Sequence, residues 1–234
     1  MNLEIFKKEL EKLNINVNNT QLKQLDDYYN LLIEWNNKIN LTAITDKDQV
    51  YLKHFYDSLT ITKSIDLNEI DSLCDIGTGA GFPGMVIKIL FPNINVTLVD
   101  SLNKRIEFLK IVKERLKLNK LEIYHDRAEE FAHNNIEKFD VVTARAVANL
   151  STLLEYSIPM VKINKYFIAL KSNVDEEIIN SKNALEKLNS KIDEKIEFLL
   201  PIENSKRTIL KIKKNGKTNN KYPRKYKEIK EKPL

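Results

Sequence analysis

The chain has 234 residues, of which 42% are hydrophobic and 30% charged, a composition typical of a soluble globular protein with a sizeable core. No apolar run approaches the roughly 20 residues of a membrane span, and the N-terminus lacks the pattern of a secretory signal. Cys74 is the only cysteine, so no internal disulfide can form. We therefore expect a protein of the reducing cytoplasm. The net charge of +5 is uneven, because residues 211–234 hold ten Lys/Arg and two Glu, a local charge of +8 that leaves −3 for the rest.

The first 65 residues are predicted to form a helical segment. Neither glycine nor proline interrupts it. Apolar residues recur at helical spacing over about residues 20–40, and a shorter pattern precedes them: Leu22, Leu25, Tyr29, Leu32, Ile33, Trp35 and Ile39 follow Ile5, Leu10 and Leu13. We expect Trp35 to be a core residue rather than an exposed stacking platform.

From about residue 72, strand and helix patterns alternate. The predicted parallel strands are "SLCDI" (72–76), "NVTLVD" (95–100), "LEIYH" (121–125), "FDVVTAR" (139–145) and "YFIALK" (166–171). Thr152 and Glu155 are predicted to form a capping box for a helix through Val161, and Asn173 and Glu176 to cap a further helix. "KIEFLLP" (195–201) and "RTILKIK" (207–213) are predicted to pair antiparallel. This order predicts an α/β fold with a mostly parallel sheet, whose ligand lies beyond the carboxyl ends of the strands.

Four of the five glycines lie in "LCDIGTGAGFPG" (73–84), between the first predicted strand and its helix. Such a turn lets the backbone approach a ligand closely. Gly79, Gly81 and Gly84 fit the dinucleotide fingerprint G-x-G-x-x-G. However, two extra residues separate that fingerprint from the strand, and Pro83 removes a backbone N–H where the phosphate-binding helix would begin.

The same loop also fits a second frame. Asp75 is followed by Gly77, Gly79 and Gly81, and Asp100 ends the next strand, as in class I methyltransferases that bind S-adenosylmethionine. Asp100 can accept from both ribose hydroxyls, each charge-assisted bond contributing roughly 1.5–3 kcal/mol. Asp75 would lie near the cationic methionine portion. An NAD-dependent oxidoreductase also places an acidic residue on the ribose and remains the alternative to the methyltransferase that we favour.

Longer motifs carry a resemblance to one family: "WNNKINLTAIT", "FYDSL", "DIGTGAGFPG", "LVDSLNKRIEFLKIV", "DRAEEF", "DVVTARAVANLSTLLEYSIPMVK" and the terminal "KYPRK" and "KPL". From about residue 20 to the end, the chain resembles the RsmG (GidB) family of bacterial 16S ribosomal RNA guanine-N7 methyltransferases. The resemblance implies a Rossmann-like class I methyltransferase domain over 66–213, an N-terminal helical extension over 1–65 and a basic tail over 214–234. It also implies methyl transfer from S-adenosylmethionine to N7 of a guanine in the decoding region.

The resemblance further implies which residues contact the cofactor. They are Gly77, Phe82, Asp100, Ser101, Leu102, Ala128, Glu129 and Arg145, to which the glycine-loop argument adds Asp75 and Gly79. Ala128 and Glu129 are expected to frame the adenine. The chain departs from the family pattern at Asn164-Lys165, where two glycines are usual, at Ser172, where a glycine is common, and in the tail segment "YKEIKEKPL".

Guanine N7 carries a lone pair and no proton, so its methylation requires no general base. We expect positioning to supply most of the catalysis. Arg145 and Lys171 are the candidate catalytic side chains, each at a strand end, with a structural ion pair as the alternative for both. His54 is expected to hold the helical segment against the sheet rather than to contact substrate. His125 and His133 lack metal-ligand spacing and are expected at the surface, so no metal is predicted.

The basic tail has two interpretations. Its lysines could hold phosphates of 16S ribosomal RNA or the small ribosomal subunit while Tyr222 and Tyr226 stack on bases, or the tail could be solvated and merely aid solubility. Deletion of 215–234 is expected to weaken RNA binding and to leave cofactor affinity intact. We expect a monomer without a membrane partner. A non-catalytic RNA-binding protein is the second alternative function.

Overall fold

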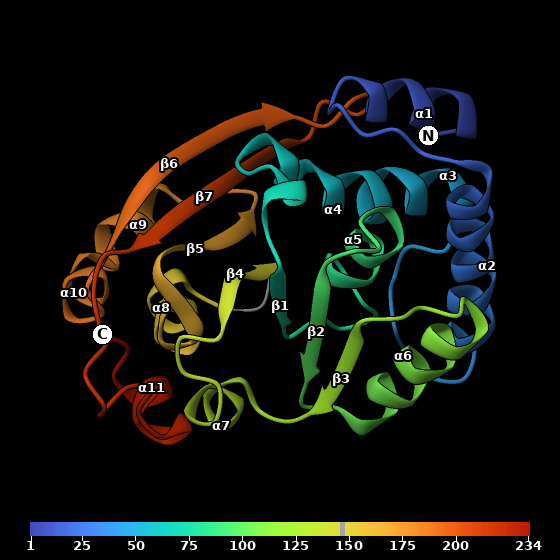
Figure 1. The fold of residues 1–234 in the computed structure, drawn as a ribbon. Coiled ribbons are helices and arrows are strands. Elements are labelled where there is room, and N and C mark those ends of the chain that lie inside the picture. The colour runs from blue at the N-terminus through green and yellow to red at the C-terminus, as the bar shows by residue number, and fades with distance from the viewer. Residues whose placement is uncertain (146–147) are drawn as a thin grey trace.

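In the computed structural model, which describes residues 1–145 and 148–234, a twisted seven-stranded sheet lies between two layers of helices (Figure 1). The strands are β1 (Ser72–Ile76), β2 (Asn95–Asp100), β3 (Leu121–His125), β4 (Phe139–Arg145), β5 (Val161–Lys171), β6 (Ser190–Leu199) and β7 (Lys206–Lys214). Their order is β3-β2-β1-β4-β5-β7-β6, with β1 to β5 parallel and β7 antiparallel to both of its neighbours. The predicted mostly parallel sheet with a terminal antiparallel pair is confirmed.

Strand β5 begins five residues earlier than predicted. Its first residue, Val161, pairs with Phe139, and the register then shifts before Tyr166 pairs with Val141. Asn164 within this irregular stretch has φ +65°, a conformation that asparagine tolerates better than most residues. The polar residues of this stretch break the apolar alternation by which a strand is recognised, so the sequence pattern missed it.

One face of the sheet is covered by the helices that follow β1 and β2, and the N-terminal helices pack outside that layer. These are α1 (Leu3–Glu11), α2 (Asn19–Asn36), α5 (Gly84–Leu90) and α6 (Asn103–Arg115). Asn18 and Gln21 form a capping box that starts α2. Tyr28 of α2 is fully buried, with its ring 6.3 Å from that of Phe108 in α6. Trp35 is half-buried against the same Phe108. The N-terminal segment and the sheet therefore share one hydrophobic cluster.

A second N-terminal stretch carries polar side chains to the carboxyl end of the sheet. It comprises α3 (Lys47–Val50), a π-helical turn η1 (Tyr51–Tyr56), α4 (Asp57–Leu59), and the 3₁₀ turns η2 (Thr60–Lys63) and η3 (Leu67–Glu69). π-Helical turns occur frequently at functional sites, because they shift the side chains that follow out of the α-helical register. Here the turn contains His54 and is followed directly by Asp57.

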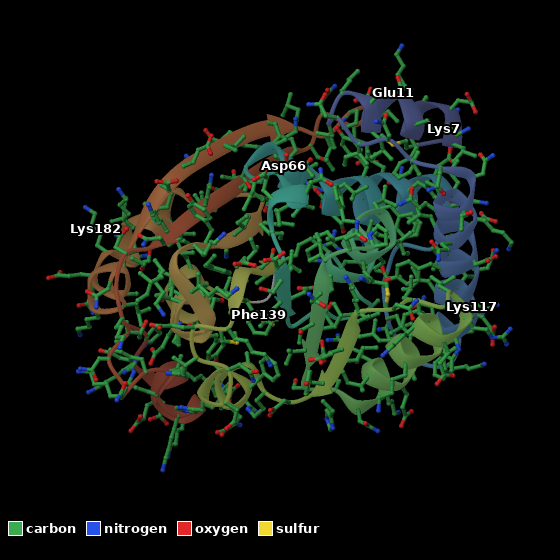
Figure 2. The ribbon with its side chains drawn as sticks, in the orientation of Figure 1. Lys7, Glu11, Asp66, Lys117, Phe139 and Lys182 are labelled. Carbon is green, nitrogen blue, oxygen red and sulfur yellow. The ribbon has the colours of Figure 1, made fainter. Side chains whose placement is uncertain are left out.

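The opposite face of the sheet is covered by α7 (Ala128–His133), α8 (Leu150–Ser157), the 3₁₀ turn η4 (Ile158–Met160), α9 (Asp175–Asn180), α10 (Lys182–Lys187) and α11 (Tyr226–Glu231). Figure 1 shows α11 beside α7 and α8, at the end of the chain. In Figure 2, Lys7, Glu11, Lys117 and Lys182 lie at the periphery, and the buried Phe139 lies among the central elements. In the two described ranges, no helix has the length and apolarity needed to cross a membrane.

Both capping predictions in this layer are wrong. Helix α8 begins at Leu150, before Thr152, and it ends at Ser157. Glu155 does not cap it, because its fully buried carboxylate instead accepts hydrogen bonds from Arg224. The N-cap of helix α9 is Val174, which makes no side-chain cap bond; the predicted Asn173 lies one residue earlier, and its Oδ1 accepts only a long 3.5 Å bond from the Asp175 N–H. A partner 69 residues away cannot be recognised from local spacing.

Candidate active site

Two carboxylates, Asp100 and Asp75, hold the glycine loop after β1. The N–H of Gly79 donates to Asp100 Oδ2 at 2.9 Å, and Gly79 has φ +62°, a left-handed conformation that favours glycine. Gly84 must also be glycine, because a Cβ there would lie 2.3 Å from Leu98 Cδ2. The Tyr28 hydroxyl of α2 donates to the carbonyl oxygen of Ala80 in the same loop. The loop is thus fixed by β2 on one side and by the N-terminal segment on the other.

Asp75 organises the loop from inside the protein. Its buried Oδ2 accepts from Thr78 Oγ1 at 2.6 Å and from the Gly84 N–H at 2.8 Å. Its Oδ1 is also buried and accepts no hydrogen bond from any described residue. Burial raises the pKa of Asp75 to about 7, against the lowering effect of these two bonds. A contact between Asp75 and a ligand stays a prediction.

A first cavity of about 550 Å³ opens beyond the carboxyl ends of β1, β2 and β3. Five of the residues predicted to contact a cofactor line it: Gly77, Asp100, Ser101, Ala128 and Glu129. Asp100 is 3% exposed; its Oδ1 accepts from the Leu102 N–H at 2.9 Å and its Oδ2 from Arg105 Nη1 at 3.2 Å as well as from Gly79. The volume lies in the usual range of small-molecule sites.

Four other predicted contacts lie near this cavity without being among its described lining residues. Asp75 and Gly79 belong to the loop just described, and Leu102 is 52% exposed at the start of α6. Phe82 is buried, and its ring stacks on that of His54 with centroids 4.4 Å apart. Cofactor contacts for these residues stay predictions. These residues of the glycine motif hold the loop and its surroundings in place without lining the cavity.

The cavity also contains residues that the sequence analysis missed as cofactor contacts. Tyr156 of α8 and three residues of the C-terminal segment, Tyr226, Lys230 and Pro233, line it. They are separated from the glycine loop by about a third to two thirds of the chain, and no spacing rule links them to it. Tyr226 was singled out only as a base-stacking residue.

A second cavity, of about 350 Å³, lies on the other side of the β4 end. Its lining combines four cations with one acid: Lys53, Arg145, Lys171, Arg207 and Asp57. The remaining lining residues are Ile44, His54, Thr60, Leu170, Ser172, Phe198 and Ile209. Asp57 bridges two of the cations, because its Oδ1 accepts from Arg207 Nε at 3.0 Å and its Oδ2 from Arg145 Nη1 at 3.3 Å. Lys53 and Lys171 are paired with Glu203 at 3.0 Å and with Glu177 at 2.6 Å, so four cations face three acids and leave one net positive charge. That charge can attract a phosphate, and the apolar wall can receive a base.

Arg145 joins the N-terminal segment to the sheet. Its Nη1 donates to the Lys53 carbonyl oxygen at 2.9 Å, and its guanidinium lies 5.2 Å from the centroid of the Phe82 ring. Burial lowers the pKa of Arg145 and the Asp57 carboxylate opposes that effect, so the side chain stays a cation. The predicted alternative for Arg145, a structural ion pair, is present as its contact with Asp57. Arg145 also lines the second cavity, so the same side chain can contact a substrate there.

His54 is neutral and lies between Arg145 and Thr42. Burial, and then the positive charge of Arg145, lower its pKa to about 3. Arg145 Nη2 lies 3.1 Å from His54 Nδ1, and Thr42 Oγ1 lies 2.8 Å from its Nε2. Because the guanidinium can only donate, Nδ1 is the acceptor and Nε2 carries the proton, which it donates to Thr42. His54 therefore holds the helical segment against the sheet, as expected, while it also lines the second cavity.

Lys171 is linked by hydrogen bonds to the start of α8. Its Nζ donates to Glu177 Oε2 at 2.6 Å and to the Ala148 carbonyl oxygen at 2.9 Å. Glu177 Oε2 also accepts from the Leu150 N–H at 2.7 Å. Ala148 lines the first cavity and Lys171 the second, so this network connects the two. Here too the predicted ion-pair alternative is present, and a catalytic role for Lys171 stays a prediction.

The other histidines and the cysteine lie outside both cavities. His125 and His133 are exposed, as expected, and Cys74 is buried in β1. Over 1–145 and 148–234, no three His, Cys, Asp or Glu side chains are grouped so that they could hold a metal ion. The chemistry of the site thus lies in a nucleoside-sized cavity with a buried carboxylate and in a cationic cavity beside it.

Comparisons with known proteins agree with this geometry. A family model described as GidB, rRNA small subunit methyltransferase G, matches residues 21–209. Over 228 residues, the chain is 51% identical to the ribosomal RNA small subunit methyltransferase G of Bacillus licheniformis, covering 96% of this chain and 95% of that protein. It is 48% identical to the protein of the same name from Listeria welshimeri, with 96% of each chain covered.

Solved structures with low sequence identity share the fold. One is a 16S rRNA (adenine(1408)-N(1))-methyltransferase from Catenulisporales acidiphilia, crystallised with S-adenosylmethionine, with a TM-score of 0.53, 13% identity and coverage of 64% of this chain and 87% of that one. Another is a S-adenosylmethionine-dependent methyltransferase from Aquifex aeolicus, with a TM-score of 0.51, 16% identity and coverage of 71% and 93%. The predicted Rossmann-like methyltransferase fold is confirmed.

Proposed function

The chain belongs to the rRNA small subunit methyltransferase G family, and from that membership we propose that it transfers a methyl group from S-adenosylmethionine to N7 of a guanine in the decoding region of 16S ribosomal RNA. The observation that carries the proposal is the pair of cavities at the carboxyl edge of the sheet, one with the buried carboxylate of Asp100 and one lined by four cations. The NAD-dependent alternative loses its support, because the family is one of methyltransferases.

The residues of the first cavity fit S-adenosylmethionine, whose sulfonium supplies an electrophilic methyl group. Asp100 lines the cavity and would accept from the ribose hydroxyls: one of its about four acceptor sites, on Oδ1, is free, and a second becomes free when the partly exposed Arg105 releases Oδ2. Ala128 and Glu129, the first two residues of α7 after β3, would frame the adenine. Asp75 is fully buried and is not among the lining residues of this cavity, so it would act on the methionine portion through the glycine loop, which it holds by its bonds to Thr78 and Gly84.

The second cavity would receive the acceptor nucleotide. Arg145 and Arg207 present cations to its phosphate or to guanine O6, and Phe198 presents an apolar face. The neutral His54 has both ring nitrogens committed to Arg145 and Thr42 and would take no proton from the base. None is required at N7. Alignment of the base with the methyl group can lower the barrier by roughly 7–11 kcal/mol, so positioning by these side chains suffices as the mechanism.

The partner would be 16S ribosomal RNA or the small ribosomal subunit, met in the cytoplasm by a monomer. Exposed lysines after β7 support RNA contact: Lys217, Lys221, Lys225, Lys227, Lys230 and Lys232. Tyr222 is 4% exposed, so the prediction that it stacks on bases is wrong. Tyr226, at 41%, remains accessible.

The test is transfer of labelled methyl from S-adenosylmethionine to small ribosomal subunits that lack the modification. Wild-type protein is expected to label 16S ribosomal RNA. Arg207→Gln, in the second cavity, is expected to reduce labelling at least about tenfold, the effect of losing a charged hydrogen bond, with unchanged affinity for S-adenosylhomocysteine. Binding of this product without any labelling by wild-type protein would overturn the proposal in favour of a non-catalytic RNA-binding protein.

A further inference from the structure

The C-terminal segment after β7 is packed against the body of the protein rather than solvated. Tyr222 and Ile229 are buried in the cluster that also contains α8. Tyr226, Lys230 and Pro233 then line the first cavity together with the glycine-loop residue Gly77. Figure 1 shows α11 next to α7, the helix that follows β3. The last residues of the chain thus complete a cavity whose other residues come from the sheet edge and from α8.

A buried ion pair anchors this segment. Glu155 of α8 is fully buried, and its carboxylate accepts from the Arg224 N–H at 2.9 Å, from Nε at 2.8 Å and from Nη2 at 2.7 Å. Arg224 Nη2 also donates to the carbonyl oxygen of Lys232 at 2.9 Å. Removal of one partner of such a pair leaves an uncompensated buried charge. The anchor therefore fixes both ends of α11.

From this anchored position, Tyr226 reaches the residues expected at the adenine. Its ring centroid lies 3.7 Å from the guanidinium carbon of Arg127, a distance at which a cation and an aromatic face attract. Arg127 Nε in turn donates to Glu129 Oε1 at 2.6 Å. Glu129 has a 3% exposed side chain. Tyr226, Arg127 and Glu129 all line the first cavity, so the ring, the guanidinium and the carboxylate form one row along its wall.

We propose that residues 222–234 are part of the cofactor site: Tyr226 holds the Arg127–Glu129 pair in place for the adenine, and the segment as a whole closes that side of the cavity. The ligand class is an adenine nucleoside, and the proposal rests on the proposed function in taking it to be S-adenosylmethionine. Tyr226 is then a positioning residue as well as a wall. This replaces the expectation that the tail serves RNA alone and that its loss leaves cofactor affinity intact.

One consequence is a link between the two substrates. The same short segment carries exposed Lys225, Lys227 and Lys232 on its outer side and Tyr226 against the cavity. RNA phosphates that contact these lysines would hold the segment, and therefore the row that begins at Tyr226, in its closed position. Cofactor affinity should then rise when RNA is bound, and by linkage RNA affinity should rise with cofactor.

The test measures binding of S-adenosylhomocysteine and of 5′-methylthioadenosine, which keeps the adenosine but lacks the amino-acid part, to the full chain by calorimetry. Tyr226→Ala is expected to weaken both about tenfold, the upper part of the range for a cation over an aromatic ring. Tyr226→Phe keeps the ring and should restore both affinities to within about threefold. Glu231→Gln is the matched control, because Glu231 is an exposed residue of the same helix, is not one of the lysines proposed to contact RNA and is not among the lining residues of the cavity.

A double-variant comparison separates positioning from a general loss of structure. If Tyr226 acts through Arg127, then Tyr226→Ala combined with Arg127→Ala should weaken binding no more than the stronger single variant does. Equal affinity of wild type and Tyr226→Ala would overturn the inference while leaving the proposed function intact, and so would a loss confined to S-adenosylhomocysteine. Failure of the wild-type protein to bind S-adenosylhomocysteine would instead overturn the proposed function.

Discussion

Replacement of Asp100 by asparagine tests the assignment of the first cavity. The substitution keeps the size of the side chain and one acceptor oxygen for the Leu102 N–H. It removes the negative charge and replaces the oxygen that accepts from Gly79 and Arg105 by a donor. Charged hydrogen bonds contribute roughly 1.5–3 kcal/mol and neutral ones roughly 0.5–1.5 kcal/mol. For two ribose hydroxyls, the expected loss is about 2 kcal/mol or more, which is about 30-fold in affinity.

The assay is calorimetric titration of wild type and Asp100→Asn with S-adenosylhomocysteine at one ionic strength, with thermal unfolding as the check on folding. Arg105→Gln is the matched control, because it removes the 3.2 Å ion pair with Asp100 and leaves the carboxylate in place. Its affinity should stay within about threefold of wild type, since the Arg105 side chain is 35% exposed and such pairs contribute little. A folded Asp100→Asn variant with wild-type affinity would refute the assignment of Asp100 to the ribose.

Three further predictions concern stability and pH. The pKa of His54 is about 3 in the folded protein, against a usual 6.5. As pH falls from about 6.5 towards 3, the unfolded chain therefore binds a proton at His54 that the folded protein does not. The free energy of unfolding should fall over this range by up to about 1.4 kcal/mol per pH unit from this group. In urea unfolding at several pH values, the free energy of unfolding should depend less steeply on pH for His54→Gln than for wild type, whereas the exposed His125→Gln should match wild type. Equal pH dependence of His54→Gln and wild type would contradict the low pKa of His54. Gly84→Ala should destabilise by about 1–3 kcal/mol, since its Cβ would lie 2.3 Å from Leu98 Cδ2, whereas Gly216→Ala, with its nearest atom at 3.8 Å, should be close to neutral; equal unfolding midpoints for the two would count against the packing argument. Finally, the rate of methyl transfer at saturating substrates should be flat between about pH 8 and 9, above the pKa of Asp75 at about 7, because N7 has no proton to lose, and a tenfold rise per unit would reveal a general base.

The sequence was sufficient to predict the sheet, its parallel core and the cavity edge. Strands such as 72–76 and 139–145 are apolar on both sides, because residues of β1 and β4 face both hydrophobic clusters. Their carboxyl ends had to meet at one edge, which is where Gly77, Asp100 and Ala128 line the first cavity. This part of the site is built from residues that directly follow strands, so chain order alone brings them together.

The rest of the site depends on contacts between distant segments. Glu155 looked like a helix cap three residues after Thr152, but its partner is Arg224. Arg145 could be placed at a strand end, whereas its bond to the Lys53 carbonyl oxygen follows from how the N-terminal helices pack on the sheet. Tyr226 has no local pattern that points to Arg127. Such partners are chosen by tertiary packing, which spacing within one element does not encode.

The most direct test of the central claim is the position of the methyl group. Small ribosomal subunits lacking the modification, and naked 16S ribosomal RNA as a second substrate, would be treated with the wild-type protein and labelled S-adenosylmethionine. The RNA would then be cleaved with aniline after reduction, which breaks the chain at N7-methylguanine. Scission at a single guanine of the decoding region, carrying all of the label, is the predicted result. Label that resists this cleavage, and so lies on another atom or on a 2′-hydroxyl, would contradict the account.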